Sequence, residues 1–216
     1  MAATGYKLTA EKAWIFRITH KDNLPWILNH GLHCRTSPSR DPNFVQIGNV
    51  DLISKRSHHP VRGAQGRTLA DYIPFYFTPF SLMLYNIKTG HNGVTRRDMS
   101  EIVILTTSLN LLQKNQIEFL FTDRHAYQET AQFYSDLCDL DRLRWDLWQQ
   151  RDFQRDPEEP GKVDSYQAEA LVYNYLPAGL LKGVLCSTLS VRDEVKRMVD
   201  SARVKLPVEQ RKNWFF

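Results

Sequence analysis

The chain has 216 residues, of which 42% are hydrophobic and 12% aromatic, so it is long enough for one well-packed domain and too short for two ordinary ones. It contains no apolar run of about eighteen residues and begins with a polar stretch, so we expect a cytoplasmic protein without a membrane span or secretory signal. Three widely separated cysteines suggest neither a disulfide framework nor a zinc site, and a net charge of +4 permits an anionic partner without requiring one.

The N-terminal third predicts a strand, a helix and a long irregular segment. Residues 14–18 form an aromatic and β-branched run that is typical of a strand. A helix is expected to follow, because Pro25 fits its first turn and Gly31 fits the position after its end. From residue 33 to residue 69, repeated proline and glycine predict a long loop, and loops of this length are usually functional or disordered.

The rest of the chain mixes strands and helices without regular alternation. Residues 72–77 predict a strand, and Pro74 within it favours an edge or a bulge. Apolar residues at spacings of three and four predict a helix over 131–147, and a charged surface loop is expected over 149–165. Shorter elements are predicted as strands at residues 102–105, 117–121, 169–173 and 184–186, and as helices from Leu82 and from about Ser190. This pattern indicates an α+β domain whose strands form two packed sheets.

Local patterns give only weak candidates for a functional site. Motifs of the common nucleotide-binding, zinc-protease and hydrolase sites do not occur. Glu169 begins an apolar run and would place an acid at the mouth of a buried strand, although a glutamate there is more often a solvated edge residue. On local grounds, Arg56 is more commonly a solvated loop arginine. His20 fits a helix cap as well as a ligand contact, and His125 fits the opening of a helix.

Taken together, four strings resemble the DarT family of ADP-ribosyltransferases in content and order. They are Arg17-Ile18-Thr19-His20-x-Asp22-Asn23-Leu24, then Ala70-Asp71-Tyr72-x-Pro74-Phe75-Tyr76-Phe77-x-Pro79-x-Ser81-x-Met83-Leu84-Tyr85, then Phe121-Thr122-Asp123-Arg124-His125, and finally Gln167-Ala168-Glu169-x-Leu171-Val172. The resemblance runs from about residue 14 to the C-terminus. It implies the ADP-ribosyltransferase fold, an α+β arrangement in which a split pair of small antiparallel sheets with flanking helices encloses a NAD cleft.

The resemblance also implies an activity and a domain plan. A single domain, 1–216, would be an NAD-dependent toxin that transfers ADP-ribose to thymine N3 of single-stranded DNA and releases nicotinamide. A loop region at about 123–167 would present the acceptor. Glu169 would be the catalytic glutamate, because a carboxylate stabilises an oxocarbenium-like transition state. Arg56 would be the second catalytic residue, which either assists loss of the N3 proton or stabilises the thymine anion.

Further contacts with NAD are implied by the same family pattern. Many relatives carry histidine where this chain has Arg17, so the arginine departs from a frequent pattern. For Tyr76 and Met83, a role in the core is equally compatible with packing. The implied NAD-binding residues are Arg17, Ile18, Thr19, His20, Trp26, Leu32, Arg56, Tyr76 and Met83.

The implied contacts with DNA lie in the acceptor-presenting region. Residues 141–162 hold five Lys/Arg and six Asp/Glu, so charge alone does not indicate nucleic acid. The predicted contacts are Arg142, Arg144, Trp145, Arg151 and Arg155, with the arginines on phosphates and the tryptophan stacked on a base. A helix that buries its aromatic residues is the alternative. Because thymine N3 lies on the pairing edge of the base, a single-stranded substrate follows once thymine is granted.

Partners and competing hypotheses complete these expectations. The resemblance implies a macrodomain antitoxin similar to DarG, and we expect no metal, no membrane partner and a monomer. One alternative is an ADP-ribosyltransferase of the same fold that acts on guanine, RNA or protein, since loops change acceptors readily. Another is a binding module for NAD or nucleic acid that has lost catalysis, although the presence of both Glu169 and Arg56 argues against it.

Overall fold

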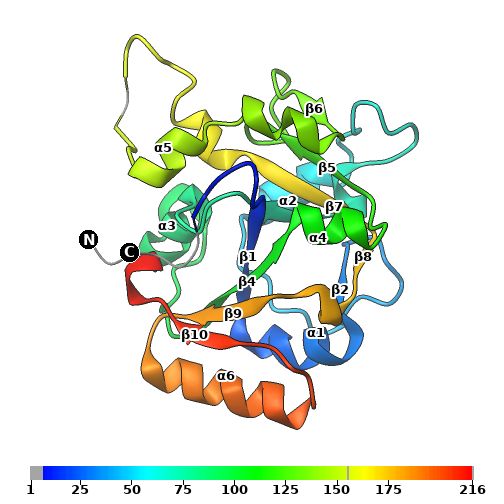
Figure 1. Ribbon diagram of the computed structural model, residues 1–216, viewed down its shortest axis with the longest axis vertical. Coiled ribbons are helices and arrows are strands. Elements are labelled where there is room, and N and C mark those ends of the chain that lie inside the picture. Colours follow the sequence, from blue (N-terminus) through cyan, green and yellow to red (C-terminus); the bar gives the residue numbers. More distant parts are fainter. Residues whose placement is uncertain (1–6, 155, 216) are drawn as a thin grey trace.

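The computed structural model describes residues 7–154 and 156–215, which form a mixed sheet with helices around it (Figure 1). The strands are β1 (Trp14–His20), β2 (Leu32–His33), β3 (Tyr72–Tyr76), β4 (Ile102–Ser108), β5 (Phe119–Thr122), β6 (Phe133–Tyr134), β7 (Glu169–Tyr173), β8 (Tyr175–Leu176), β9 (Gly183–Cys186) and β10 (Val208–Gln210). The α-helices are α1 (Leu24–His30), α2 (Val50–Arg56), α3 (Leu82–Thr89), α4 (Leu109–Lys114), α5 (Trp145–Gln150) and α6 (Leu189–Ser201). Short 3-10 helices are η1 (Lys21–Asn23), η2 (Leu69–Asp71), η3 (His91–Gly93), η4 (Leu137–Arg142), η5 (Asp164–Gln167), η6 (Ala178–Leu180) and η7 (Lys212–Trp214).

The main sheet is split near its middle. Its strand order is β10-β9-β4-β1-β3-β7-β5-β6, and β2 pairs separately with β8. The two central strands, β1 and β3, share only the register pair Phe16 and Tyr76, whereas β3 pairs with β7 along its whole length. Pro74 explains part of this split, because its missing N–H lies on the edge of β3 that faces β1 and costs no ladder hydrogen bond there. The predicted α+β class with a split sheet is confirmed, with one parallel pair, β9 and β10, at an edge.

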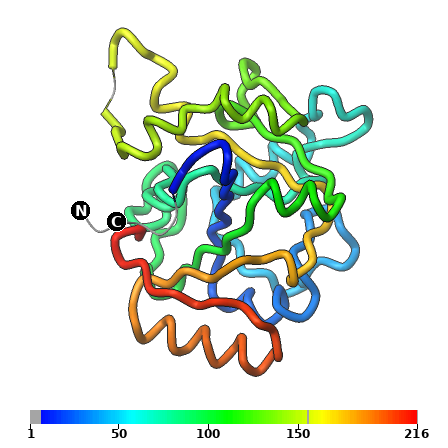
Figure 2. Tube along the Cα trace, viewed as in Figure 1, coloured from blue at the N-terminus to red at the C-terminus, as the bar shows by residue number. Residues whose placement is uncertain are grey.

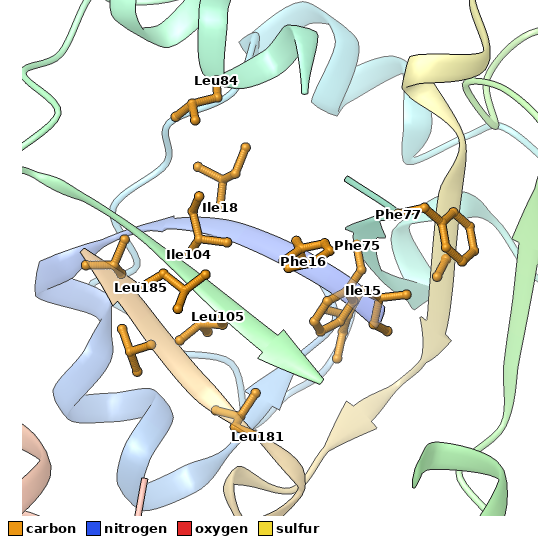
Figure 3. Packing of buried hydrophobic residues seen from close by; sticks show 14 of the residues in the cluster. Ile15, Phe16, Ile18, Phe75, Phe77, Leu84, Ile104, Leu105, Leu181 and Leu185 are labelled. Atoms are coloured by element: carbon orange, nitrogen blue, oxygen red, sulfur yellow. The ribbon is translucent and has the colours of Figure 1, made fainter. Parts of the chain in front are cut away.

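The core is formed where β1 and β4 lie side by side. Residues 102–107 of β4 are all buried, as expected for a continuous apolar run covered on both faces. Figure 3 shows buried side chains of this core, among them Ile15 and Phe16 of β1, Leu105 of β4 and Leu185 of β9. Helix α6 packs along β9 and β10 at one end of the molecule (Figure 1). This half of the sheet, from β10 to β1, forms one side of the split.

The predicted helix over 131–147 is wrong. The chain instead forms β6, η4 and α5 in succession, at the end of the molecule opposite α6 (Figure 2). Local side-chain bonds compete with an α-helix, because Asp136 accepts from the Cys138 N–H at 2.9 Å and the Trp145 Nε1–H donates to the Leu140 carbonyl at 2.7 Å. Ala131, Leu140, Leu143 and Leu147 are nevertheless buried, and the apolar residues 133, 134 and 137 are half-buried, so their spacing reports burial and not helical continuity.

The long segment from 33 to 69 is not irregular throughout, because it contains α2. Asn49 begins this helix by accepting a hydrogen bond from the Leu52 N–H at 2.9 Å. The helix spans only Val50–Arg56 and buries none of its residues fully, so no apolar stripe marks it in the sequence. No helix among the described residues combines the length and apolarity needed to cross a bilayer.

Candidate active site

A cavity of about 360 Å³ lies beside the split in the sheet. Strands β1, β3 and β7 contribute Arg17, Tyr76 and Glu169 to its lining, and α3 contributes Met83. The segment 33–56 forms much of the opposite wall. The cavity therefore brings together residues from all four strings found in the sequence, since His125 also lines it.

Glu169 and Arg56 form a buried ion pair in this cavity. Arg56 Nη1 and Nη2 donate to Glu169 Oε1 and Oε2, both at 2.9 Å. The Arg56 side chain is 12% exposed and the Glu169 side chain is 1% exposed, so the interpretation of Arg56 as a solvated loop residue is wrong. Thr122 Oγ1 accepts from the Glu169 N–H at 3.2 Å and fixes the start of β7. A parallel, charge-assisted pair of this kind offsets the cost of burying a carboxylate.

His125 lies against the same carboxylate, and local patterns did not identify it as a site residue. Its Nδ1 accepts from the Tyr127 N–H at 3.1 Å, so the neutral ring carries its proton on Nε2. Nε2 lies 3.6 Å from Glu169 Oε1. Burial lowers the pKa of His125, and the positive charge of Arg56 lowers it further, whereas Glu169 opposes the shift. The predicted helix opening is absent, and the signal for this residue was its place in the third string.

Tyr76 and Arg17 lie on the two strands that border the split. Tyr76 is the register neighbour of Glu169, and its hydroxyl donates to Met83 Sδ at 3.2 Å. Burial raises the pKa of Tyr76, and the nearby Glu169 raises it further. Arg17 Nη1 donates to the Pro74 carbonyl at 2.8 Å, across the gap between β1 and β3, while its buried Nε has no partner. Burial lowers the pKa of Arg17 to about 10.

Two further arginines in the cavity wall were not predicted from the sequence. With the Gln46 amide oriented so that its oxygen faces them, that oxygen accepts from Arg35 Nη1 at 3.0 Å and from Arg40 Nη2 at 3.3 Å. Burial lowers the pKa of Arg40, and the like charge of Arg35 lowers it further. Among the described lining residues there are four arginines and a single carboxylate, that of Glu169. This excess of positive charge suits an anionic ligand such as a diphosphate.

Three residues predicted to contact NAD do not line the cavity. His20 Nδ1 accepts from the Asp22 N–H at 3.2 Å and caps η1, which is the role that local reasoning left open for it. Trp26 packs against His30 with ring centroids 4.2 Å apart. Leu32 is buried and pairs with β8. Of the other predicted residues, Arg17, Ile18, Thr19, Arg56, Tyr76 and Met83 do line it.

The predicted DNA-binding arginines that the structure describes also lie outside the cavity lining. Arg142 is 66% exposed and pairs with Asp139, and Arg144 pairs with two acidic side chains. The guanidinium of Arg151 stacks 3.6 Å from the centroid of a phenylalanine ring. Arg155 falls outside the described residues. A contact between these arginines and DNA stays a prediction.

The predicted base-stacking residue, Trp145, is engaged with the core. Its ring lies edge-on to Phe77 and Trp148, at centroid distances of 5.5 and 5.0 Å. Trp148 is only 1% exposed. Trp148 thus follows the alternative of a buried aromatic residue, on α5 and not on a long helix, whereas Trp145 is half-buried and its stacking on a base stays a prediction.

A split sheet, with a buried and arginine-paired glutamate in a cavity lined by further arginines, is the arrangement expected of an ADP-ribosyltransferase. The profile of a family described as "ssDNA thymidine ADP-ribosyltransferase, DarT" matches residues 16–216, and the chain belongs to this family. Within the described residues, no group of three or more His, Cys, Asp or Glu side chains is arranged to hold a metal ion.

Similar proteins support this assignment along the whole chain. A DNA ADP-ribosyl transferase from Escherichia coli O127:H6 (strain E2348/69 / EPEC) is 45% identical over 209 residues, covering 97% of this chain and 96% of that protein. Thermus sp. 2.9 DarT in complex with ADP-ribosylated ssDNA has a TM-score of 0.86 at 31% identity, covering 95% of this chain and 97% of that one. The same Thermus protein in complex with NAD+ has a TM-score of 0.81, covering 95% and 98%.

A more distant relative joins two activities in one chain. It is a DNA ADP-ribosyl transferase-DNA ADP-ribosyl glycohydrolase fusion protein from Thermosipho africanus (strain H17ap60334). It is 23% identical over 203 residues, which cover 94% of this chain and 49% of the fusion protein. The present chain therefore corresponds to about half of that longer protein.

Proposed function

We propose that this chain transfers ADP-ribose from NAD+ to thymine in single-stranded DNA and that Glu169 and Arg56 are its catalytic pair. The main support for this proposal is the buried, bidentate ion pair between these residues in the cavity. The family assignment and the Thermus structures with NAD+ and with ADP-ribosylated ssDNA support the substrates.

The arginines of the cavity give NAD+ an orientation. Arg35 and Arg40, held together by Gln46, offer guanidinium groups to the diphosphate. Glu169 lines the same cavity, beside Tyr76 on the neighbouring strand, and would meet the nicotinamide ribose. In this orientation the anionic part of the substrate meets the excess positive charge, and the reacting sugar meets the carboxylate.

Glu169 keeps acceptor capacity for a ribose hydroxyl. Each carboxylate oxygen can accept about two hydrogen bonds. Oε1 accepts from Arg56 and faces His125, whereas Oε2 accepts from Arg56 alone among the described side chains. Oε2 is therefore the oxygen we assign to the hydroxyl. The same carboxylate stabilises positive charge on the sugar as its bond to nicotinamide breaks and nicotinamide leaves as a neutral molecule.

Arg56 acts on the acceptor. Thymine N3 forms the new bond to the ribose carbon, and its proton leaves to water or to Glu169. A guanidinium stays protonated in proteins, so Arg56 cannot itself take that proton and instead stabilises the negative charge that develops on the base. We infer that residues 123–167, which include His125 next to the carboxylate, present the acceptor strand.

A comparison of one thymine-containing strand in single-stranded and duplex form tests the acceptor chemistry. Because N3 is engaged in base pairing in the duplex, we expect modification of the single strand and little of the duplex. A strand carrying N3-methylthymine as its only thymine serves as the control and stays unmodified. Modification of this strand would place the new bond elsewhere on the base and would overturn the N3 assignment.

We also propose a macrodomain partner that removes ADP-ribose from DNA. The fusion of a DNA ADP-ribosyl glycohydrolase to a relative of this chain supports such a pair. In the pair, this chain acts as the toxin and the glycohydrolase as the antitoxin. Co-expression of a macrodomain glycohydrolase should restore the growth of cells that produce this chain, and an inactive glycohydrolase should restore it less if reversal is what protects them.

A further inference from the structure

Asn23 belongs to the first family-like string but does not line the cavity. Its side chain is buried, with the residue only 1% exposed, and its amide is fully engaged. Nδ2 donates to the Val45 carbonyl and to Thr19 Oγ1, both at 3.0 Å, and Oδ1 accepts from the Val45 N–H at 2.8 Å. The amide therefore pairs with both backbone groups of Val45, as a neighbouring strand would.

A second anchor holds the next residue along the chain. Arg97 Nη2 donates to the Gln46 carbonyl at 3.4 Å, while its Nη1 donates to Glu101 Oε2 at 3.1 Å. Glu101 Oε2 also lies 3.2 Å from His20 Nε2. His20, another member of the first string, therefore contacts Glu101, which holds the Arg97 side chain, and does not line the cavity.

These anchors hold a segment without helix or strand. Residues 44–48 run from Phe44 to Gly48 between irregular neighbours, and four of them line the cavity. The Gln46 side chain in turn holds Arg35 and Arg40. Because no strand ladder fixes this wall, side-chain bonds from the body of the domain hold its backbone at Val45 and Gln46, next to Ile47, which packs into the core.

We propose that Asn23 is a positioning residue for the NAD+ site and acts by fixing residues 44–48. Arg97 supports the same residues through its bond to the Gln46 carbonyl. This inference rests on the proposed function, because it takes NAD+ as the ligand. Asn23 occupies the N-cap position of α1 but makes no cap hydrogen bond, so its amide serves the wall and not the helix. Without the amide, Val45 regains partners for its N–H and C=O by moving toward water, and Gln46 and its two arginines move with it.

The test compares Asn23→Ala with Asn29→Ala in the full chain. Asn29 lies on α1 too and donates to the Pro25 carbonyl at 2.7 Å, but it is exposed and does not line the cavity. Calorimetry gives the Kd for NAD+, and hydrogen exchange reports the protection of the Val45 and Gln46 amides. We expect Asn23→Ala to weaken NAD+ binding about tenfold, as the loss of its two hydrogen bonds to Val45 implies, and to speed exchange at residues 44–48. Asn29→Ala should change neither.

Arg97→Met provides an independent test if Asn23→Ala fails to fold. It keeps an apolar stem, removes the bond to the Gln46 carbonyl and should also weaken NAD+ binding. A folded Asn23→Ala or Arg97→Met protein with unchanged NAD+ affinity and unchanged exchange at 44–48 would overturn the inference. A lower Tm with unchanged affinity would leave Asn23 a purely structural residue and would also overturn it. If the wild-type chain binds NAD+ but modifies no thymine strand, the proposed acceptor fails while this binding test still stands.

Discussion

Arg56 and Glu169 are 113 positions apart in the chain and meet through two parallel hydrogen bonds of 2.9 Å. The pair joins the end of α2 to the start of β7, so a helix in the cavity wall and the strand next to β3 share one charge contact. In the proposed reaction each side chain also acts on a substrate, Glu169 on the nicotinamide ribose and Arg56 on the acceptor base. Replacing one residue at a time tests these two roles separately.

Replacing Glu169 with glutamine should abolish transfer. Glutamine keeps the size of the side chain but lacks the negative charge. That charge stabilises the positive sugar in the transition state, so we expect the rate of transfer to fall about 100-fold to 1000-fold. The amount of ADP-ribose added to a thymine strand in a fixed time measures the rate of transfer, and circular dichroism checks that the variant folds. A folded Glu169→Gln protein with normal transfer would remove Glu169 from the mechanism.

Replacing Arg56 with alanine should impair transfer more than NAD+ binding. The arginine acts on the acceptor anion, whereas Arg35 and Arg40 remain to hold the diphosphate. The change also leaves the Glu169 carboxylate, 1% exposed, without its bidentate partner, and breaking a buried pair costs about 3 to 5 kcal/mol. Kinetics with varied NAD+ and urea unfolding measure the two effects. Equal losses of transfer and of NAD+ affinity would make Arg56 a clamp for NAD+.

Two replacements of His125 separate its contact with Glu169 from its bulk. Glutamine can place an N–H donor near the position of Nε2, whereas phenylalanine fills the space without a donor. We expect His125→Phe to lower kcat about 100-fold, as a misplaced catalytic group does, with a smaller loss in His125→Gln. The KM for the DNA strand should stay unchanged in both. A raised KM for the strand with normal kcat would instead make His125 a contact for the acceptor.

The same residue predicts a dependence of stability on pH. The pKa of His125 in the folded protein lies below the ordinary histidine value of 6.5, mainly because of burial. As pH falls through 6.5, the unfolded chain takes up this proton before the folded protein does, so the folded state loses stability. His125→Gln cannot titrate and should lose less free energy of unfolding between pH 7.5 and 5.5, as urea titrations would measure. An equal loss in both proteins would contradict the assigned direction of the shift.

Sequence patterns predicted the fold where burial is continuous. Strands β1, β4, β7 and β9 are runs of apolar residues and were found with small errors at their ends. Helix α6 was also expected, since Val191, Val195 and Val199 form one buried face. The helix predicted over 131–147 failed because short 3-10 turns and side-chain bonds place the same residues wholly or partly in the core without helical continuity.

The candidate site was accessible from the family resemblance and not from spacing. Nothing local indicates that Arg56 meets Glu169, because tertiary folding alone brings α2 to β7. His20 was placed in the NAD+ site through its neighbours in the first string, yet the chain turns at the end of β1 and directs its ring to η1 and Glu101. Arg35 and Arg40 lay in a segment of mild charge, and only the folded wall makes them neighbours.

The most direct test of the account is the intact mass of short single-stranded oligonucleotides after incubation with the purified protein and NAD+, using matched strands with and without thymine. The account predicts one added ADP-ribose on the thymine strand, none on the thymine-free strand, and none on either strand with Glu169→Gln. No addition to any strand, or equal addition to thymine-free strands, would contradict it.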